Sequence, residues 1–101
     1  MNFTGVTIWH KKGQEYKRLY FDTSTVTEEK AIEGSAAGEL SKNSALIRLY
    51  ALYECGISVG DKLCVRYDEA TEPPEGAYII TEIKGFFNVA ATLRHYRIKC
   101  R

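Results

Sequence analysis

The sequence has few of the residues from which catalytic or metal centres are built. It contains two histidines, His10 and His95, and three cysteines, Cys55, Cys64 and Cys100, all far apart in the chain. Structural zinc sites need close pairs of the form C-x₂₋₄-C, and a general base needs a partner and a pocket. We therefore predict no catalytic residue, no metal and no cofactor, and expect the chain not to be an enzyme.

Long apolar runs and a surplus of charge of one sign are also missing. No stretch is long enough to span a bilayer, and the first residues lack the basic start and apolar segment of a secretory signal. The odd, widely spaced cysteines argue for a reducing compartment. With 14 Lys and Arg against 13 Asp and Glu, the net charge is +1, which predicts no large basic field. We expect a cytoplasmic chain without membrane contact.

Proline occurs only at Pro73 and Pro74, inside an acidic segment at residues 68–76 that cannot continue a strand. Elsewhere, apolar and polar residues alternate with a period of two between turn signals, which indicates half-buried strands. The expected strands are residues 6–10, 16–21, 45–53, 61–67, 77–84 and 92–100. The predicted fold class is all-β: a small antiparallel barrel or sandwich of about six strands, in one domain over residues 1–101.

The secondary structure of residues 45–53 has an alternative, and two of the turns between strands have specific requirements. Residues 45–53 also show apolar side chains at helical spacing, and a helix there would make the class α+β. Residues 11–15, which include Gly13, predict a hairpin with a longer loop between the first two strands. Gly56 and Gly60 permit a positive φ in the turn before the fourth strand.

The inward faces of the expected strands predict the core. Ile79 and Ile83 are taken as an inward pair because the opposite face carries Glu82 and Lys84. Ile57 and Val59 are expected to close the base of the core. The predicted core residues are Ile8, Leu49, Leu63, Val65, Ile79, Ile83, Tyr96 and Ile98.

Residues 22–44 have few large apolar side chains and many small or polar ones, which predicts one long polar loop or arm. Thr25 followed by Glu28 fits a capping box for a short helix over residues 28–33, while alternation at Ser24, Val26 and Glu28 equally suits a strand. We expect the arm to become ordered against a neighbouring subunit or partner. The candidate interface residues are Thr25, Val26, Glu28, Ile32 and Leu40, with Phe86 and Phe87 from the last connection.

Two further patterns bear on function. Residues 56–60 match G-x-S-x-G with Ser58 at the nucleophile position, but a strand follows where that motif requires a helix, so we interpret the match as accidental. Residues 94–101 interleave basic and aromatic side chains, and Phe86 and Phe87 could stack bases as on an OB-type barrel. The acidic residues 68–76 offset this basic strand in total charge.

Three segments in order resemble a known family: residues 57–63 (ISVGDKL), 78–83 (YIITEI) and 94–98 (RHYRI). They are similar to the strands of small head–tail joining proteins, the minor capsid or head-completion proteins of tailed phages and prophages. The opening hairpin, residues 6–10 (VTIWH) and 16–18 (YKR), resembles that family as well. The match covers most of the chain outside residues 22–44.

The resemblance implies a compact β-barrel that does structural work. It implies a homo-oligomeric ring in the head–tail connector, with portal, connector or tail proteins as partners. The expected location is then the virion, and the host cytoplasm before assembly. Direct DNA contact is not predicted on this interpretation, and the alternative function is a small nucleic-acid-binding β-barrel.

Overall fold

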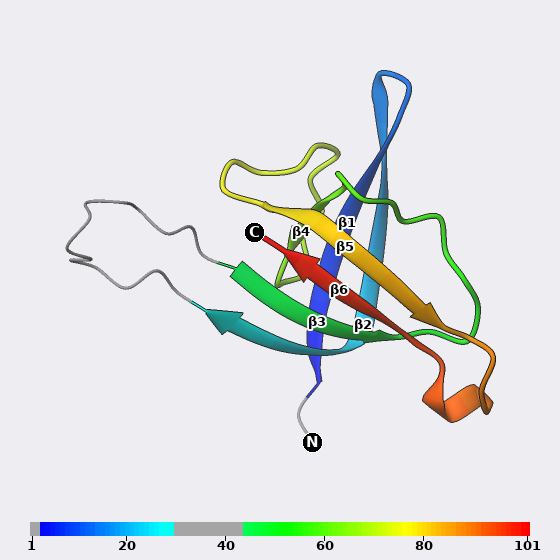
Figure 1. The fold of residues 1–101 in the computed structure, drawn as a ribbon. Coiled ribbons are helices and arrows are strands. Elements are labelled where there is room, and N and C mark those ends of the chain that lie inside the picture. Colours follow the sequence, from blue (N-terminus) through cyan, green and yellow to red (C-terminus); the bar gives the residue numbers. More distant parts are fainter. Residues whose placement is uncertain (1–2, 30–43) are drawn as a thin grey trace.

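The computed structural model describes residues 3–29 and 44–101. Six strands form a closed antiparallel barrel in the order β1-β2-β3-β6-β5-β4 (Figure 1), which confirms the all-β prediction and selects a barrel over a sandwich. The elements are β1 (Thr4–Lys12), β2 (Glu15–Glu29), β3 (Ser44–Tyr50), β4 (Lys62–Cys64), β5 (Tyr78–Phe86), the 3₁₀ turn η1 (Ala91–Leu93) and β6 (His95–Cys100). Within the described ranges, no helix is long and apolar enough to cross a membrane.

The hairpin between β1 and β2 is tighter than expected. Lys12 pairs with Glu15, so the loop contains only Gly13 and Gln14, and the prediction of a longer loop was wrong. Gly13 has a φ of 65°, which fits the first central position of a two-residue turn that demands glycine. The hairpin projects beyond the rest of the barrel (Figure 1).

Strand β2 is much longer than predicted. Its first part pairs with β1, and from Ser24 to Glu29 it pairs with β3. The assignment of residues 22–29 to a loop was therefore wrong, as was the start of a helix at Glu28. The β-branched run at residues 25–27 favours an extended backbone, and β3 satisfies its hydrogen bonds. The strand alternative for this segment is confirmed, and residues 30–43 lie outside the described residues.

The core fills the barrel interior. The fully or nearly fully buried apolar residues of its main cluster are Val6, Ile8, Ala45, Ile47, Leu49, Leu63, Ile80, Tyr96, Ile98 and Cys100. Five of the eight predicted core residues are in this set, and Val65 and Ile83 pack against it. Of the strand predicted over residues 92–100, the alternation is confirmed for residues 95–100, because Tyr96, Ile98 and Cys100 all point inward. The start at residue 92 was wrong, because Thr92 and Leu93 belong to η1.

The inward assignment of Ile79 was wrong. Ile79 is 41% exposed, whereas Ile80 is completely buried. A register shift against β6 lies between Ile80 and Glu82, so that Ile80 faces Cys100 and Ile83 faces Ile98. Such a bulge inserts one extra residue and changes the face that the following side chains occupy. A strict period of two therefore fails across β5.

Besides the last strand, two further expected strands are shorter than the pattern suggested. Strand β3 ends at Tyr50, so it is a strand and not a helix, but Tyr53 is 76% exposed. Strand β4 has only three residues, and Tyr67 is exposed. Val59 is 63% exposed, so only Ile57 of the predicted pair packs against the core. Of the two glycines expected to permit a positive φ in the turn into β4, Gly60 has one, at 99°, and Gly56 does not.

The middle of strand β1 is buried on both faces. Its outward residues Thr7 and Trp9 have no exposed surface, because residues 65–77, which we call the covering loop, fold over them. The Trp9 indole donates a hydrogen bond to the Ala70 carbonyl at 2.8 Å. The Thr7 hydroxyl donates to the Arg66 carbonyl at 2.6 Å and accepts from the Asp68 amide at 3.0 Å.

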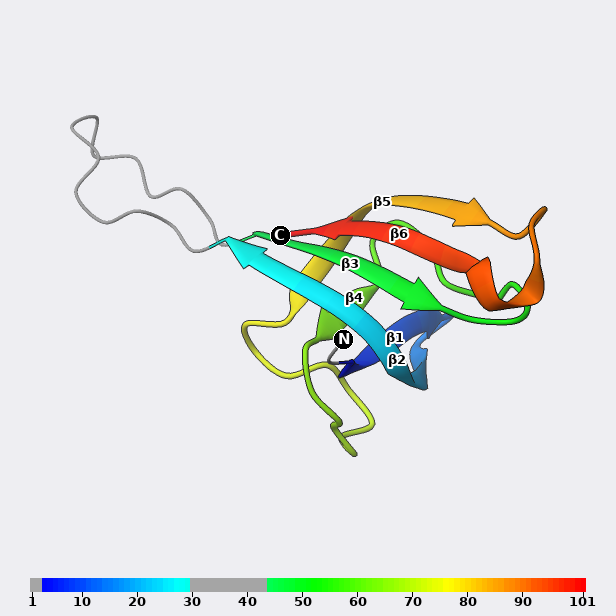
Figure 2. The ribbon, with the colours of Figure 1, turned by 90° about the horizontal axis from the view of Figure 1, so that it is seen from below.

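The opposite wall is made of β3, β6 and β5, and no loop among residues 3–29 and 44–101 covers it in this way. Figure 2 shows these three strands side by side as one layer, with β1, β4 and the first part of β2 forming the other side of the barrel. Outward residues of β3 and β6 alternate regularly with buried ones. This wall, which we call the open wall, therefore keeps its outer side chains in solvent.

Candidate functional site

The predicted interface residues of β2 fall on two different faces. Thr25 points outward and pairs with Arg48 of the open wall. Val26 pairs with Ile47 and packs against the core. The Glu28 carboxylate accepts a hydrogen bond from the Tyr78 hydroxyl at 2.8 Å. Val26 and Glu28 therefore have structural roles within the barrel, while Ile32 and Leu40 lie outside the described residues.

The two phenylalanines of the last connection also separate. Phe86 stacks on His95, with ring centroids 4.8 Å apart and planes 14° apart. Phe87 packs edge-on against Tyr96 at 4.8 Å and borders the core. Phe86 thus belongs to the outer surface and Phe87 to the interior, so the structure does not bring them together as one base-stacking pair.

His10 is joined to a buried carboxylate. Its Nδ1 lies 3.0 Å and 3.1 Å from the two carboxylate oxygens of Asp61, which also accepts a hydrogen bond from the Ser58 amide at 2.7 Å. No hydrogen bond between the Ser58 hydroxyl and His10 is found among the described residues. The arrangement ties the β1–β2 hairpin to the turn before β4, and it does not form a nucleophile–base pair.

The cysteines lie in apolar surroundings. Burial raises the pKa of the Cys100 thiol to about 12, and the thiol donates to the Ala45 carbonyl at 3.6 Å. Burial also raises the pKa values of Cys55 and Cys64. Thiols in such sites are poor nucleophiles. Across residues 3–29 and 44–101, no three His, Cys, Asp or Glu side chains come together in a way that could hold a metal ion.

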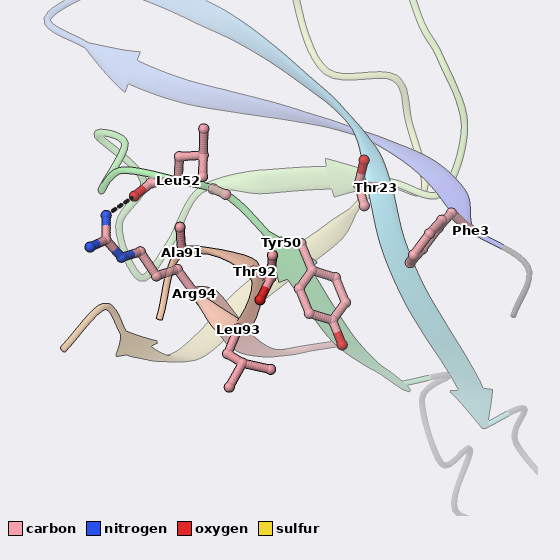
Figure 3. A pocket seen from close by; sticks show the side chains of 9 residues that line it. Phe3, Thr23, Tyr50, Leu52, Ala91, Thr92, Leu93 and Arg94 are labelled. Carbon is pink, nitrogen blue, oxygen red and sulfur yellow. Dashed lines mark hydrogen bonds between the residues drawn. The ribbon is translucent and has the colours of Figure 1, made fainter. Parts of the chain in front are cut away.

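One hollow lies at one end of the barrel, and we call it the end groove (Figure 3). It has a volume of about 490 Å³. Tyr50 lies between Phe3 and Thr23 on one side and the η1 segment on the other (Figure 3). The lining residues are Phe3, Thr23, Tyr50, Ala51, Leu52, Ala91, Thr92, Leu93 and Arg94.

Hydrogen bonds from Arg94 hold the walls of the end groove together, although several of the side chains that line it are exposed. Arg94 donates from Nε to the Val89 carbonyl at 3.2 Å and from Nη1 to the Leu52 carbonyl at 3.1 Å. These bonds hold the η1 segment against the chain that follows β3. Phe3, Leu52 and Leu93 are 52%, 56% and 60% exposed, so large apolar side chains face solvent around a preformed hollow.

Sequence reasoning missed the end groove. Leu52, Tyr53 and Leu93 were assigned to strands over residues 45–53 and 92–100, whereas in the structure they lie in the connections outside β3 and β6. Which of these side chains would meet depended on the barrel topology. β3 and β6 are far apart in sequence, yet they are neighbours in the barrel and bring Leu52 and Leu93 to the same end.

The outer side chains of the open wall form a second surface, which is basic. Arg48 of β3 pairs with Arg97 of β6, which in turn pairs with Lys84 of β5. Lys99 lies one row further along β6, opposite Glu82. We call Arg48, Lys84, Arg97 and Lys99 the basic face. All four are exposed. They come from three strands that are separated in the sequence, so the sequence did not predict that they would group.

Comparison with known proteins gives no assignment: no protein-family model, curated protein or solved structure matches the chain.

Proposed function

We propose that the chain is a structural subunit of the head–tail connector of a tailed phage, a head-completion or stopper-like protein that acts by ring assembly. The observation that carries the proposal is the end groove. Phe3, Leu52 and Leu93 expose more than half of their surface around one hollow. Apolar side chains that gather in this way on a small domain mark an interaction site.

The shape of the groove favours a ring over a symmetric dimer. A hollow cannot fill an identical hollow, so a second copy must insert a different, protruding surface into it. Such a contact is heterologous, and heterologous contacts that repeat with a closing rotation produce rings. A closed barrel supports this mode of assembly, because it has no free strand edge through which copies would pair instead.

The resemblance to head–tail joining proteins supports the assignment of the proposed ring to the head–tail connector. Its three segments fall on β4, β5 and β6 and the turns that lead into them, and these strands are neighbours in the barrel. Within the first segment, Gly60 makes the positive-φ turn and Asp61 holds the turn through the Ser58 amide. On this proposal, the partners are portal, connector and tail proteins, and the location is the virion.

Assembly is tested by light scattering and electron microscopy across a concentration series. The wild-type chain should form closed rings, and Leu93→Asp, which places a charge in the end groove, should remain monomeric. Val59→Asp is the matched control, since Val59 is 63% exposed and lies outside the groove. A wild-type chain that stays monomeric at every concentration, or rings that Leu93→Asp leaves intact, would contradict the proposal.

The connector assignment has its own test. Genes for portal, capsid and tail proteins should flank the gene for this chain. Rings from a gene without such neighbours would support assembly but refute the connector role.

A further inference from the structure

The basic face places like charges directly opposite each other. Arg48, Arg97 and Lys84 form one row across β3, β6 and β5. Directly opposite side chains in a sheet have Cβ atoms about 4.5–5.5 Å apart, and like charges at that distance destabilise the pair. A row of three cations therefore needs an anion to compensate it.

The described part of the chain provides only one such anion. Glu82 lies 3.8 Å from the Lys84 ammonium and 3.4 Å from that of Lys99. Among the side chains that the structure describes, no carboxylate lies within 4.0 Å of Arg48 or Arg97. No described residue accepts a side-chain hydrogen bond from either guanidinium group, and the planar donor fork of arginine suits the oxygens of a phosphate.

The surface between these side chains is shallowly hollowed. One hollow of about 300 Å³ is bordered by Thr25, Arg48 and Arg97. A smaller one of about 80 Å³ is bordered by Glu82, Lys84, Arg97 and Lys99. Arg97 borders both hollows. Thr25 and Thr27 add hydroxyl groups on the β2 side of the larger one, and hydroxyls commonly contact phosphate oxygens.

The neighbouring aromatic side chains decide between single-stranded and duplex nucleic acid. Proteins that bind single strands offer aromatic faces on which bases stack. Here Phe86 and His95 stack on each other, and Tyr50 lies tilted against His95 with ring centroids 5.7 Å apart. Each of these three rings already packs against another aromatic side chain. The surface therefore suits the phosphate backbone of a duplex better than unstacked bases.

We propose that the basic face binds the backbone of duplex DNA without reading its base sequence. Phosphate oxygens would accept hydrogen bonds from Arg48 and Arg97, with Lys84 and Lys99 as additional charges. The inference does not rest on the connector role, because the end groove and the basic face share no residue. A monomeric barrel that does not assemble into a ring would bind duplex DNA through the same surface.

The test is fluorescence anisotropy of a short labelled duplex with the full chain at several salt concentrations. Neutralising three or four phosphates predicts a slope of log K against log salt between about −2.7 and −3.6. Arg48→Ala and Arg97→Ala should each weaken binding about tenfold, as expected for a lost charged hydrogen bond, and each should reduce the slope by about 1. Changing the base sequence should have little effect.

Arg66→Ala is the matched control, since it removes one exposed arginine from the covering loop. It should leave both affinity and slope nearly unchanged. Binding that Arg66→Ala weakens as much as Arg97→Ala would show nonspecific attraction and overturn the proposal. Tighter binding to a single strand of the same length, or no duplex binding at low salt, would also overturn it.

The outcome is separable from the assembly test. Leu93→Asp should abolish rings and keep the duplex affinity per subunit, whereas Arg97→Ala should keep rings and lose affinity. If Arg97→Ala instead disrupted rings while the wild-type chain ignored DNA, the occupant of the basic face would be an acidic surface of a neighbouring copy.

Discussion

The two walls of the barrel differ in what covers them. Thr7 and Trp9, which point outward from the middle of β1, are completely buried under the covering loop, while Arg48, Arg97 and Lys99 of the open wall are exposed. The covering loop is held by Trp9 and Thr7, and further by Arg18, which donates to the Asp68 carbonyl at 3.1 Å. The same strand architecture thus buries outer side chains on one wall and leaves those of the other exposed.

The largest effect should come from the covered wall. Trp9→Ala should lower the free energy of unfolding by about 3–5 kcal/mol, because a buried ring is removed and a cavity remains. Urea denaturation measures this. Trp9→Phe, which keeps most of the ring and loses only the bond to Ala70, should cost less. An effect of Trp9→Ala no larger than that of an exposed residue would mean that the loop does not cover β1.

The bulge in β5 is tested by two adjacent isoleucines. Ile80→Ala should destabilise the protein by about 2–5 kcal/mol, because Ile80 is fully buried in the core. Ile79→Ala should have a much smaller effect, since 41% of Ile79 is exposed. Thermal unfolding of both variants makes the comparison, and the reverse order would restore the strict alternation predicted from sequence.

A single hydroxyl should also distinguish the walls. Thr7→Val should cost about 1–3 kcal/mol, because the buried Arg66 carbonyl and Asp68 amide lose their partner. Thr25→Val is the matched control on the open wall and should stay within about 0.5 kcal/mol of the wild type. Equal losses in denaturant titrations would argue that Thr7 does not anchor the loop.

The pH dependence of stability should show how strongly the side chains on the inner side of the open wall are shielded from water. Burial raises the pKa values of Tyr96 and Cys100 to about 12, from ordinary values of 10.0 and 9.0. The folded state holds these protons more tightly, so the free energy of unfolding should fall as pH rises above about 9. Urea midpoints measured from neutral to alkaline pH test this. Cys100→Val should flatten the part of the decline due to the thiol.

The smallest effect is expected on the basic face. Arg97→Ala should change the free energy of unfolding by less than about 0.5 kcal/mol, as is usual for exposed positions. Relief of the repulsion between Arg97 and Arg48 would make any change stabilising. A large loss of stability on thermal melting would show that Arg97 supports the barrel and is not reserved for binding.

Sequence patterns predicted the parts of the fold in which strands alternate regularly. Residues 45–50 and 95–100 were assigned correctly, because one face of each strand packs against the core and the other meets solvent. Where tertiary contacts change that environment, the pattern failed. Trp9 is covered by a loop distant in sequence, and Ile79 is turned outward by a bulge against β6.

The candidate surfaces were harder to predict than the core. Arg48 and Arg97 are far apart in sequence and meet only because β3 and β6 are neighbours in the barrel. Thr25, Val26 and Glu28 were grouped as one interface, but adjacent strand residues point to opposite faces. Such groupings depend on topology, which periodicity alone does not determine.

The position of β6 has a consequence for how the protein is made. It is the last strand in the chain, yet it lies between β3 and β5 and closes the barrel. Until residues 95–100 leave the ribosome, β3 and β5 each present an unpaired edge to other chains. Closure relies on pairings between distant residues such as Ala45 and Cys100, which places folding on the order of milliseconds to seconds. Translation products that stop before β6 should therefore aggregate. In a chain that includes β6, this strand pairs with both edges and makes them unavailable to other chains.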